Sequence, residues 1–101
     1  MKRDLSKNMY SATAAFELVL PAIIAIKDSS EDEDSKKENA VNLIVATLFK
    51  KRDTCPNEIK GISRSYIEQV RKIINNKDDI NGIIRYLNNA VKAGKNYDGG
   101  N

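Results

Sequence analysis

The chain has 101 residues, with 17 Lys or Arg, 14 Asp or Glu and no His, and its formal net charge is +3 at pH 7. This length suits a single domain with one modest core, and a content of 41% hydrophobic residues is too apolar for a disordered chain and too polar for a membrane protein. Without His the chain lacks the usual general base near neutral pH and the commonest metal ligand, and a single Cys allows neither an internal disulfide nor a cysteine-built zinc site. We therefore expect a non-catalytic cytoplasmic protein that needs no cofactor and no metal.

A first helix is expected over residues 8–27, after a flexible start at residues 1–7. Its apolar residues keep helical spacing: Ala12, Ala15, Phe16, Val19, Leu20 and Ile23. Pro21 cannot donate the hydrogen bond to residue 17, so the helix should kink near Leu20 or stop and restart. The apolar run is interrupted by Glu17 and Pro21 and is too short to span a bilayer, so no membrane segment is expected.

The second half of this helix leaves almost no polar face. Residues 22–26 read Ala-Ile-Ile-Ala-Ile. Such a segment must be surrounded by protein, either as the buried centre of the domain or as a surface that another chain covers. The sequence favours the buried centre and leaves the contact surface open.

An acidic loop and a second helix should follow. Residues 28–35 contain five carboxylates, which repel one another and favour an exposed loop. Ser35 and Glu38 have the spacing of a capping box, which predicts a helix over residues 36–52. Its segment from Val41 to Phe49 is apolar on more than half of the circumference, and cations at its end complement the helix dipole.

Two further helices should form an antiparallel hairpin over residues 64–76 and 79–93. Ser63 or Ser65 is expected to cap the first, Asp78 or Asp79 to cap the second, and Gly94 to close it. A short helical turn is expected at residues 56–60 and a flexible tail at residues 95–101. The predicted fold is therefore an all-α, small four-helix bundle-like single domain over residues 1–101, with a kinked first helix.

Charge is divided unevenly between the two halves of the chain. Residues 1–49 hold 6 basic and 8 acidic residues, whereas residues 50–95 hold 11 basic and 5 acidic residues. A basic half favours an anionic partner, such as nucleic acid or an acidic protein. The residues expected to contact such a partner are Lys50, Lys51, Arg52, Lys60, Arg64, Ser65, Gln69, Arg71 and Lys72.

One string in this basic half has a familiar pattern. Residues 61–70, Gly-Ile-Ser-Arg-Ser-Tyr-Ile-Glu-Gln-Val, resemble the turn and recognition helix of the helix-turn-helix DNA-binding family. The resemblance covers the second half of that motif, because Asn57 and Lys60 stand where its first helix has a small and an apolar residue. It implies a DNA-binding transcriptional regulator that uses residues 50–72, with Glu68 among the residues near the groove.

The competing interpretation is a small interaction or regulatory protein that binds a larger protein partner through a helical face. It rests on the apolar segments at residues 21–26 and 41–49, which exceed what so small a bundle hides. Self-association would cover the same surplus. Small size and a composition rich in Ile, Lys and Asn favour a phage or other mobile element as the source. We take this interpretation as the leading one and DNA binding as its alternative.

Overall fold

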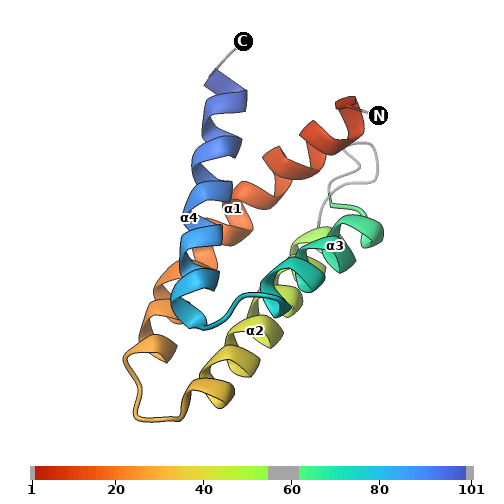
Figure 1. Cartoon of the computed structure of the whole chain (residues 1–101). Helices are drawn as coiled ribbons and strands as arrows, with labels where there is room; N and C mark the ends of the chain where they lie inside the picture. Colours follow the sequence, from red (N-terminus) through yellow and green to blue (C-terminus); the bar gives the residue numbers. More distant parts are fainter. Residues whose placement is uncertain (1, 55–61, 100–101) are drawn as a thin grey trace.

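A computed structural model describes residues 2–54 and 62–99. This part of the chain forms four helices and no strand: α1 (Lys2–Lys27), α2 (Glu33–Thr54), α3 (Arg64–Asn75) and α4 (Ile80–Gly99) (Figure 1). The prediction of a small all-α four-helix bundle is confirmed. The predicted helical turn at residues 56–60 and Cys55 lie outside the described residues.

The helices α2 and α4 each pack against all three of the other helices, whereas α1 packs chiefly against α4 and α2. Figure 1 shows α1 and α2 as an antiparallel pair that extends to the same side of the turn joining them, with α3 lying along α2. The core draws on all four helices and on Ile62, two residues before α3. Its buried residues are Ala12, Ala15, Phe16, Val19, Ile23, Ala40, Val41, Ile44, Leu48, Ile62, Ile67, Val70, Ile74, Ile80, Ile83 and Leu87.

Aromatic side chains close one side of this aliphatic core. Phe16 of α1 meets Tyr86 of α4 edge to face, with ring centroids 6.4 Å apart. Burial raises the pKa of both Tyr66 and Tyr86, and at Tyr66 the nearby Tyr86 hydroxyl adds to the rise. The tyrosine rings thus contribute apolar area while their hydroxyl groups stay neutral over the physiological range.

Helix starts are set by side chains that accept backbone N–H groups. Asp32 caps α2, because its carboxylate accepts from the Ser35 N–H at 2.8 Å, so the predicted cap at Ser35 is wrong and α2 begins at Glu33. Ser63 caps α3 by accepting from the Tyr66 N–H at 3.0 Å. Asp79 caps α4 by accepting from the Gly82 N–H at 3.0 Å. The caps of α3 and α4 are therefore among the residues that the sequence analysis predicted.

The helices α1 and α4 are longer than their sequence patterns predict. α1 begins at Lys2 and continues without interruption through Pro21, so the alternative of two separate helices is wrong. Pro21 lies on the exposed side of α1, where water can reach the Glu17 carbonyl that the missing N–H leaves without its usual donor. α4 continues to Gly99, past the predicted stop at Gly94.

Candidate interaction surface

The outward side of α1 is apolar and uncovered. Leu18 is 75% exposed and is the most exposed of the large hydrophobic side chains in the described residues. Four smaller side chains on the same side of the helix, Ala14, Pro21, Ala22 and Ala25, are also exposed. We call these five residues the α1 face. The prediction that residues 22–26 form the buried centre is wrong, since within them only Ile23 is buried.

The α1 face is uncovered because the helix buries its opposite side. Ala12, Phe16, Val19 and Ile23 point into the core and satisfy the contacts with α2 and α4. A helix that is apolar almost all round can bury only the side that its neighbours reach. The remaining apolar side of α1 is the surplus that the sequence pattern indicated.

The second apolar segment, at residues 41–49, is accommodated by the bundle. Val41, Ile44 and Leu48 are buried, and Leu43, Val45 and Phe49 are partly buried against the core. None of the large apolar side chains of α2 that the structure describes is among the exposed ones. The predicted surplus therefore belongs to α1 alone.

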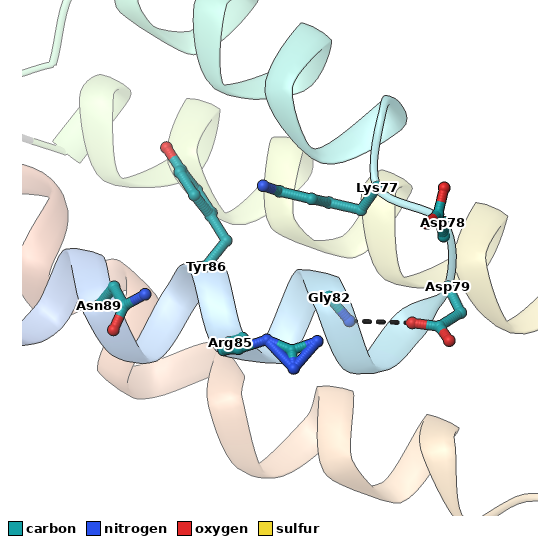
Figure 2. Close-up of a pocket in the computed structure, with 7 residues that line it drawn as sticks. All are labelled: Lys77, Asp78, Asp79, Gly82, Arg85, Tyr86 and Asn89. Atoms are coloured by element: carbon teal, nitrogen blue, oxygen red, sulfur yellow. Dashed lines mark hydrogen bonds between the residues drawn. The ribbon is translucent and has the colours of Figure 1, made fainter.

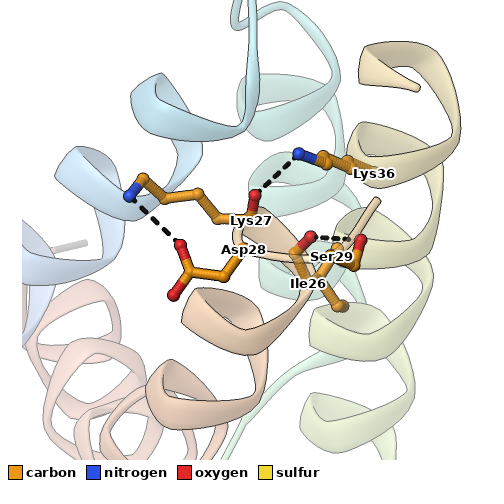
Figure 3. Close-up of polar contacts among 5 residues, drawn as sticks. All are labelled: Ile26, Lys27, Asp28, Ser29 and Lys36. Atoms are coloured by element: carbon orange, nitrogen blue, oxygen red, sulfur yellow. Dashed lines mark hydrogen bonds and ion pairs between the residues drawn. The ribbon is translucent and has the colours of Figure 1, made fainter. Parts of the chain in front are cut away.

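The α1 face ends at an ordered acidic turn (Figure 3). Lys36 of α2 donates from Nζ to the Lys27 carbonyl at 2.7 Å, and Ser29 donates from Oγ to the Ile26 carbonyl at 2.7 Å. Asp28 Oδ1 lies 3.6 Å from Lys27 Nζ. Asp28 also follows Pro21 and Ala25 at helical spacing on the same side of α1. These contacts hold a group of carboxylates at a fixed place beyond the last apolar residue of the face.

Toward α4, the α1 face is bordered by an ion pair. Glu17 Oε2 and Lys95 Nζ are 2.6 Å apart, with side chains 44% and 62% exposed. A pair so exposed adds little to stability, about 0.2 to 1 kcal/mol. It marks the polar border of the face and ties the C-terminal part of α4 to α1.

The basic residues predicted to contact a partner divide between two places. Arg64, Ser65, Gln69, Arg71 and Lys72 are all exposed on α3, opposite its buried Ile67, Val70 and Ile74. Arg71 is paired with Glu68 at 3.3 Å. This α3 surface carries three cations and one carboxylate, and it is a mixed, modestly basic surface.

The remaining predicted contacts lie at the end of α2 or outside the described residues. Lys50 is exposed, Lys51 is half-buried, and Arg52 lies 3.7 Å from Asp53. Their place in the last turns of α2 suits the negative end of the helix dipole. Lys60 lies outside the described residues, as does the first half of the motif that residues 61–70 resemble.

A shallow hollow of about 350 Å³ lies at the turn between α3 and α4 (Figure 2). Its lining residues are Lys77, Asp78, Asp79, Gly82, Arg85, Tyr86 and Asn89. Lys77 Nζ lies 5.7 Å from the centre of the Tyr86 ring, and the Asp79 carboxylate already accepts the Gly82 N–H. With two cations and two carboxylates the lining is electrically balanced, and it holds no nucleophile next to a base.

The residues that the structure describes contain neither a metal-binding group nor a helix that could span a membrane. No group of three or more His, Cys, Asp or Glu side chains in residues 2–54 and 62–99 is arranged to hold a metal ion. None of the helices described combines the length and apolar character that a bilayer crossing requires. Comparison of the chain with protein-family models, curated proteins and solved structures gave no match.

Sequence reasoning found the apolar surplus but could not locate it. The exposed apolar row is visible in the sequence. Ala14, Leu18, Pro21 and Ala25 follow one another at helical spacing, on the side of the helix away from Phe16 and Val19. Choosing between that row and the row through Phe16 required the positions of α2 and α4. The hollow near Tyr86 carried no sequence signal beyond an acidic turn.

Proposed function

We propose that this protein is a small non-catalytic interaction protein that acts by docking the α1 face on another protein chain. The single observation that carries the proposal is the exposure of Leu18, 75%, within an otherwise uncharged apolar face. An exposed large apolar side chain among smaller apolar ones on a rigid helix favours association, because burial against a partner removes this surface from water. The partner can be a larger regulatory protein or a second copy of the chain.

Affinity capture from the native host tests this proposal. The bait pair is the wild-type chain and Leu18→Glu, which keeps a good helix former at an exposed position and places a charge in the face. Ile73→Glu is the matched control, because Ile73 is a large exposed side chain on α3, 41% exposed. We expect Leu18→Glu to lose the bound protein and Ile73→Glu to keep it. Equal capture by all three chains would contradict the proposal.

A second candidate function is DNA binding through α3. It is supported by the exposure of Arg64, Ser65, Gln69 and Lys72 on one helix and by the resemblance of residues 61–70 to the helix-turn-helix family. Gel-shift assays with duplex DNA at about 50 and 200 mM salt test it, because binding through several cations weakens by orders of magnitude over that range. Charge reversal at Arg64, Arg71 and Lys72 should abolish the shift, whereas Leu18→Glu should leave it unchanged.

A further inference from the structure

One pair of residues at the start of α4 is chemically labile. Asn81 lies in the first turn of the helix, its side chain is exposed, and Gly82 follows it. No other asparagine in the sequence precedes a glycine. Because glycine has no side chain, its backbone nitrogen is open to the asparagine side chain before it. The pair is therefore the place in this chain where a backbone nitrogen can most easily attack a neighbouring amide.

The reaction that follows such an attack is deamidation. The Gly82 nitrogen loses its proton and forms a bond to the side-chain amide carbon of Asn81. The bond from that carbon to the amide nitrogen breaks, and ammonia leaves with the proton that Gly82 gave up. Water then opens the resulting imide ring at either of its carbonyl carbons. One opening gives an aspartate in a normal backbone, and the other gives an isoaspartate, in which the backbone runs through the former side chain.

The folded start of α4 restrains the attacking nitrogen (Figure 2). The Gly82 N–H donates to two oxygens of Asp79, the backbone carbonyl at 3.1 Å and Oδ1 at 3.0 Å. A proton held by a carboxylate is harder to lose, so the nitrogen is a poor nucleophile in this state. Closure of the ring also requires the backbone of Asn81 to rotate away from its helical conformation. Both conditions fail while the first turn of α4 is formed.

Packing explains why a glycine occupies this reactive place. A Cβ atom at position 82 would lie 3.2 Å from Lys77 Cβ, which is tighter than an ordinary van der Waals contact. Lys77 lies in the turn between α3 and α4, and its Nζ is 5.7 Å from the centre of the Tyr86 ring. The close approach of Lys77 to α4 thus favours glycine at position 82. The fold restrains the labile pair through the Asp79 cap while a glycine stays in place.

We propose that Asn81 is a site of spontaneous deamidation whose rate is controlled by the Asp79 cap. The reaction proceeds when the first turn of α4 opens, because opening frees the Gly82 N–H and the backbone of Asn81 together. An aspartate product keeps the helix, since a carboxylate in the first turn complements the helix dipole. An isoaspartate product adds an atom to the backbone and breaks the hydrogen-bond register of that turn. The inference goes beyond the proposed function, because no residue of the α1 face takes part.

Peptide mapping by mass spectrometry of the full chain, aged at mildly alkaline pH, measures the rate at each asparagine. The wild-type chain should deamidate at Asn81 more slowly when folded than in guanidinium chloride. In the denaturant Asn81 should react faster than Asn42, which precedes a leucine. Asp79→Ala should raise the rate at Asn81 in the folded chain about 2- to 30-fold, the factor that corresponds to the loss of a helix cap. Circular dichroism checks that each variant keeps its helices.

Two further variants separate the cap from the charge of its carboxylate. Asp79→Asn removes the charge and keeps a capping oxygen, so the slow rate should persist. Asp78→Ala removes the neighbouring carboxylate and should also leave the rate unchanged. An unchanged rate in Asp79→Ala would overturn the inference, as would equal rates at Asn81 in the folded and the unfolded wild-type chain. Fast deamidation in Asp79→Asn or in Asp78→Ala would assign the restraint to charge and would overturn it too.

Discussion

The helices α1 and α2 carry apolar segments of similar density, yet the fold hides one and exposes the other. α2 packs against the other three helices, and its Ile44 and Leu48 are fully buried. α1 packs chiefly against α2 and α4, and its Leu18 is 75% exposed. The difference shows that an apolar segment is buried only where the topology places a neighbouring helix against it. Three helices pack against α2, whereas the side of α1 that faces away from α2 and α4 stays exposed.

The sharpest test of this comparison is one substitution made on both helices. Leu48→Ala should destabilise the fold by about 2 to 5 kcal/mol, because it opens a cavity among fully buried side chains. Leu18→Ala should change the free energy of unfolding by no more than about 0.5 kcal/mol, because it removes exposed atoms. Urea unfolding at a submicromolar concentration, where association is negligible, measures both changes. Equal losses would mean that Leu18 is buried.

Pro21 gives a second contrast between the helices. Pro21→Ala restores the N–H that can bond to the Glu17 carbonyl, and we expect it to stabilise the fold by about 1 to 2 kcal/mol, after allowing for the greater freedom of the unfolded chain. The reverse change at an exposed position of α2, Ala46→Pro, should cost about 3 kcal/mol or more. Thermal and urea unfolding measure both. A destabilised Pro21→Ala would show that the proline ring itself makes contacts that the fold needs.

The helices and their core could largely be predicted from the sequence, because helical spacing of residues such as Ile67, Val70 and Ile74 depends only on local geometry. Two features could not. Ser35 and Asp32 lie within one turn of each other and can both cap a helix, and in the fold the Asp32 carboxylate accepts the Ser35 N–H. The exposure of Leu18 depends on where α2 and α4 pack, which no local pattern in α1 contains. The candidate site is thus a property of the assembled bundle.

The stability that the Asp32 cap gives to the start of α2 should be lost in acid. Hydrogen bonds from the backbone and side chain of Ser35 hold the pKa of Asp32 below its usual value of 3.8. A lowered folded-state pKa means that the carboxylate contributes stability above pH 3.8 and that this contribution is lost as the pH falls further. Asp32→Asn should reduce the fall of the melting temperature between pH 5 and pH 2 relative to the wild-type chain. An acid profile identical to that of the wild-type chain would contradict the capping role of the Asp32 carboxylate.

The smallest expected change in the free energy of unfolding is at alkaline pH and comes from Tyr66. Burial, with the nearby Tyr86 hydroxyl as a second cause, raises the pKa of Tyr66 above its usual 10.0, so the folded chain keeps a proton that the unfolded chain releases. The stability due to the neutral hydroxyl is fully present below pH 10.0 and declines above it. Tyr66→Phe should flatten the decline of stability between pH 9 and pH 11, with tyrosinate absorbance as a parallel readout. An unchanged slope would contradict the burial of this hydroxyl.

The most direct test of the central claim, that the α1 face binds another protein chain, is a set of amide ¹H–¹⁵N spectra of the labelled chain, recorded first as a dilution series and then with the unlabelled protein captured from the native host. Our account predicts that signals of residues 14–25 shift in one of these series while signals of α3 stay fixed, because only the α1 face is covered on association. Spectra that change in neither series, or shifts that map to Arg64, Gln69 and Lys72 instead, would contradict it.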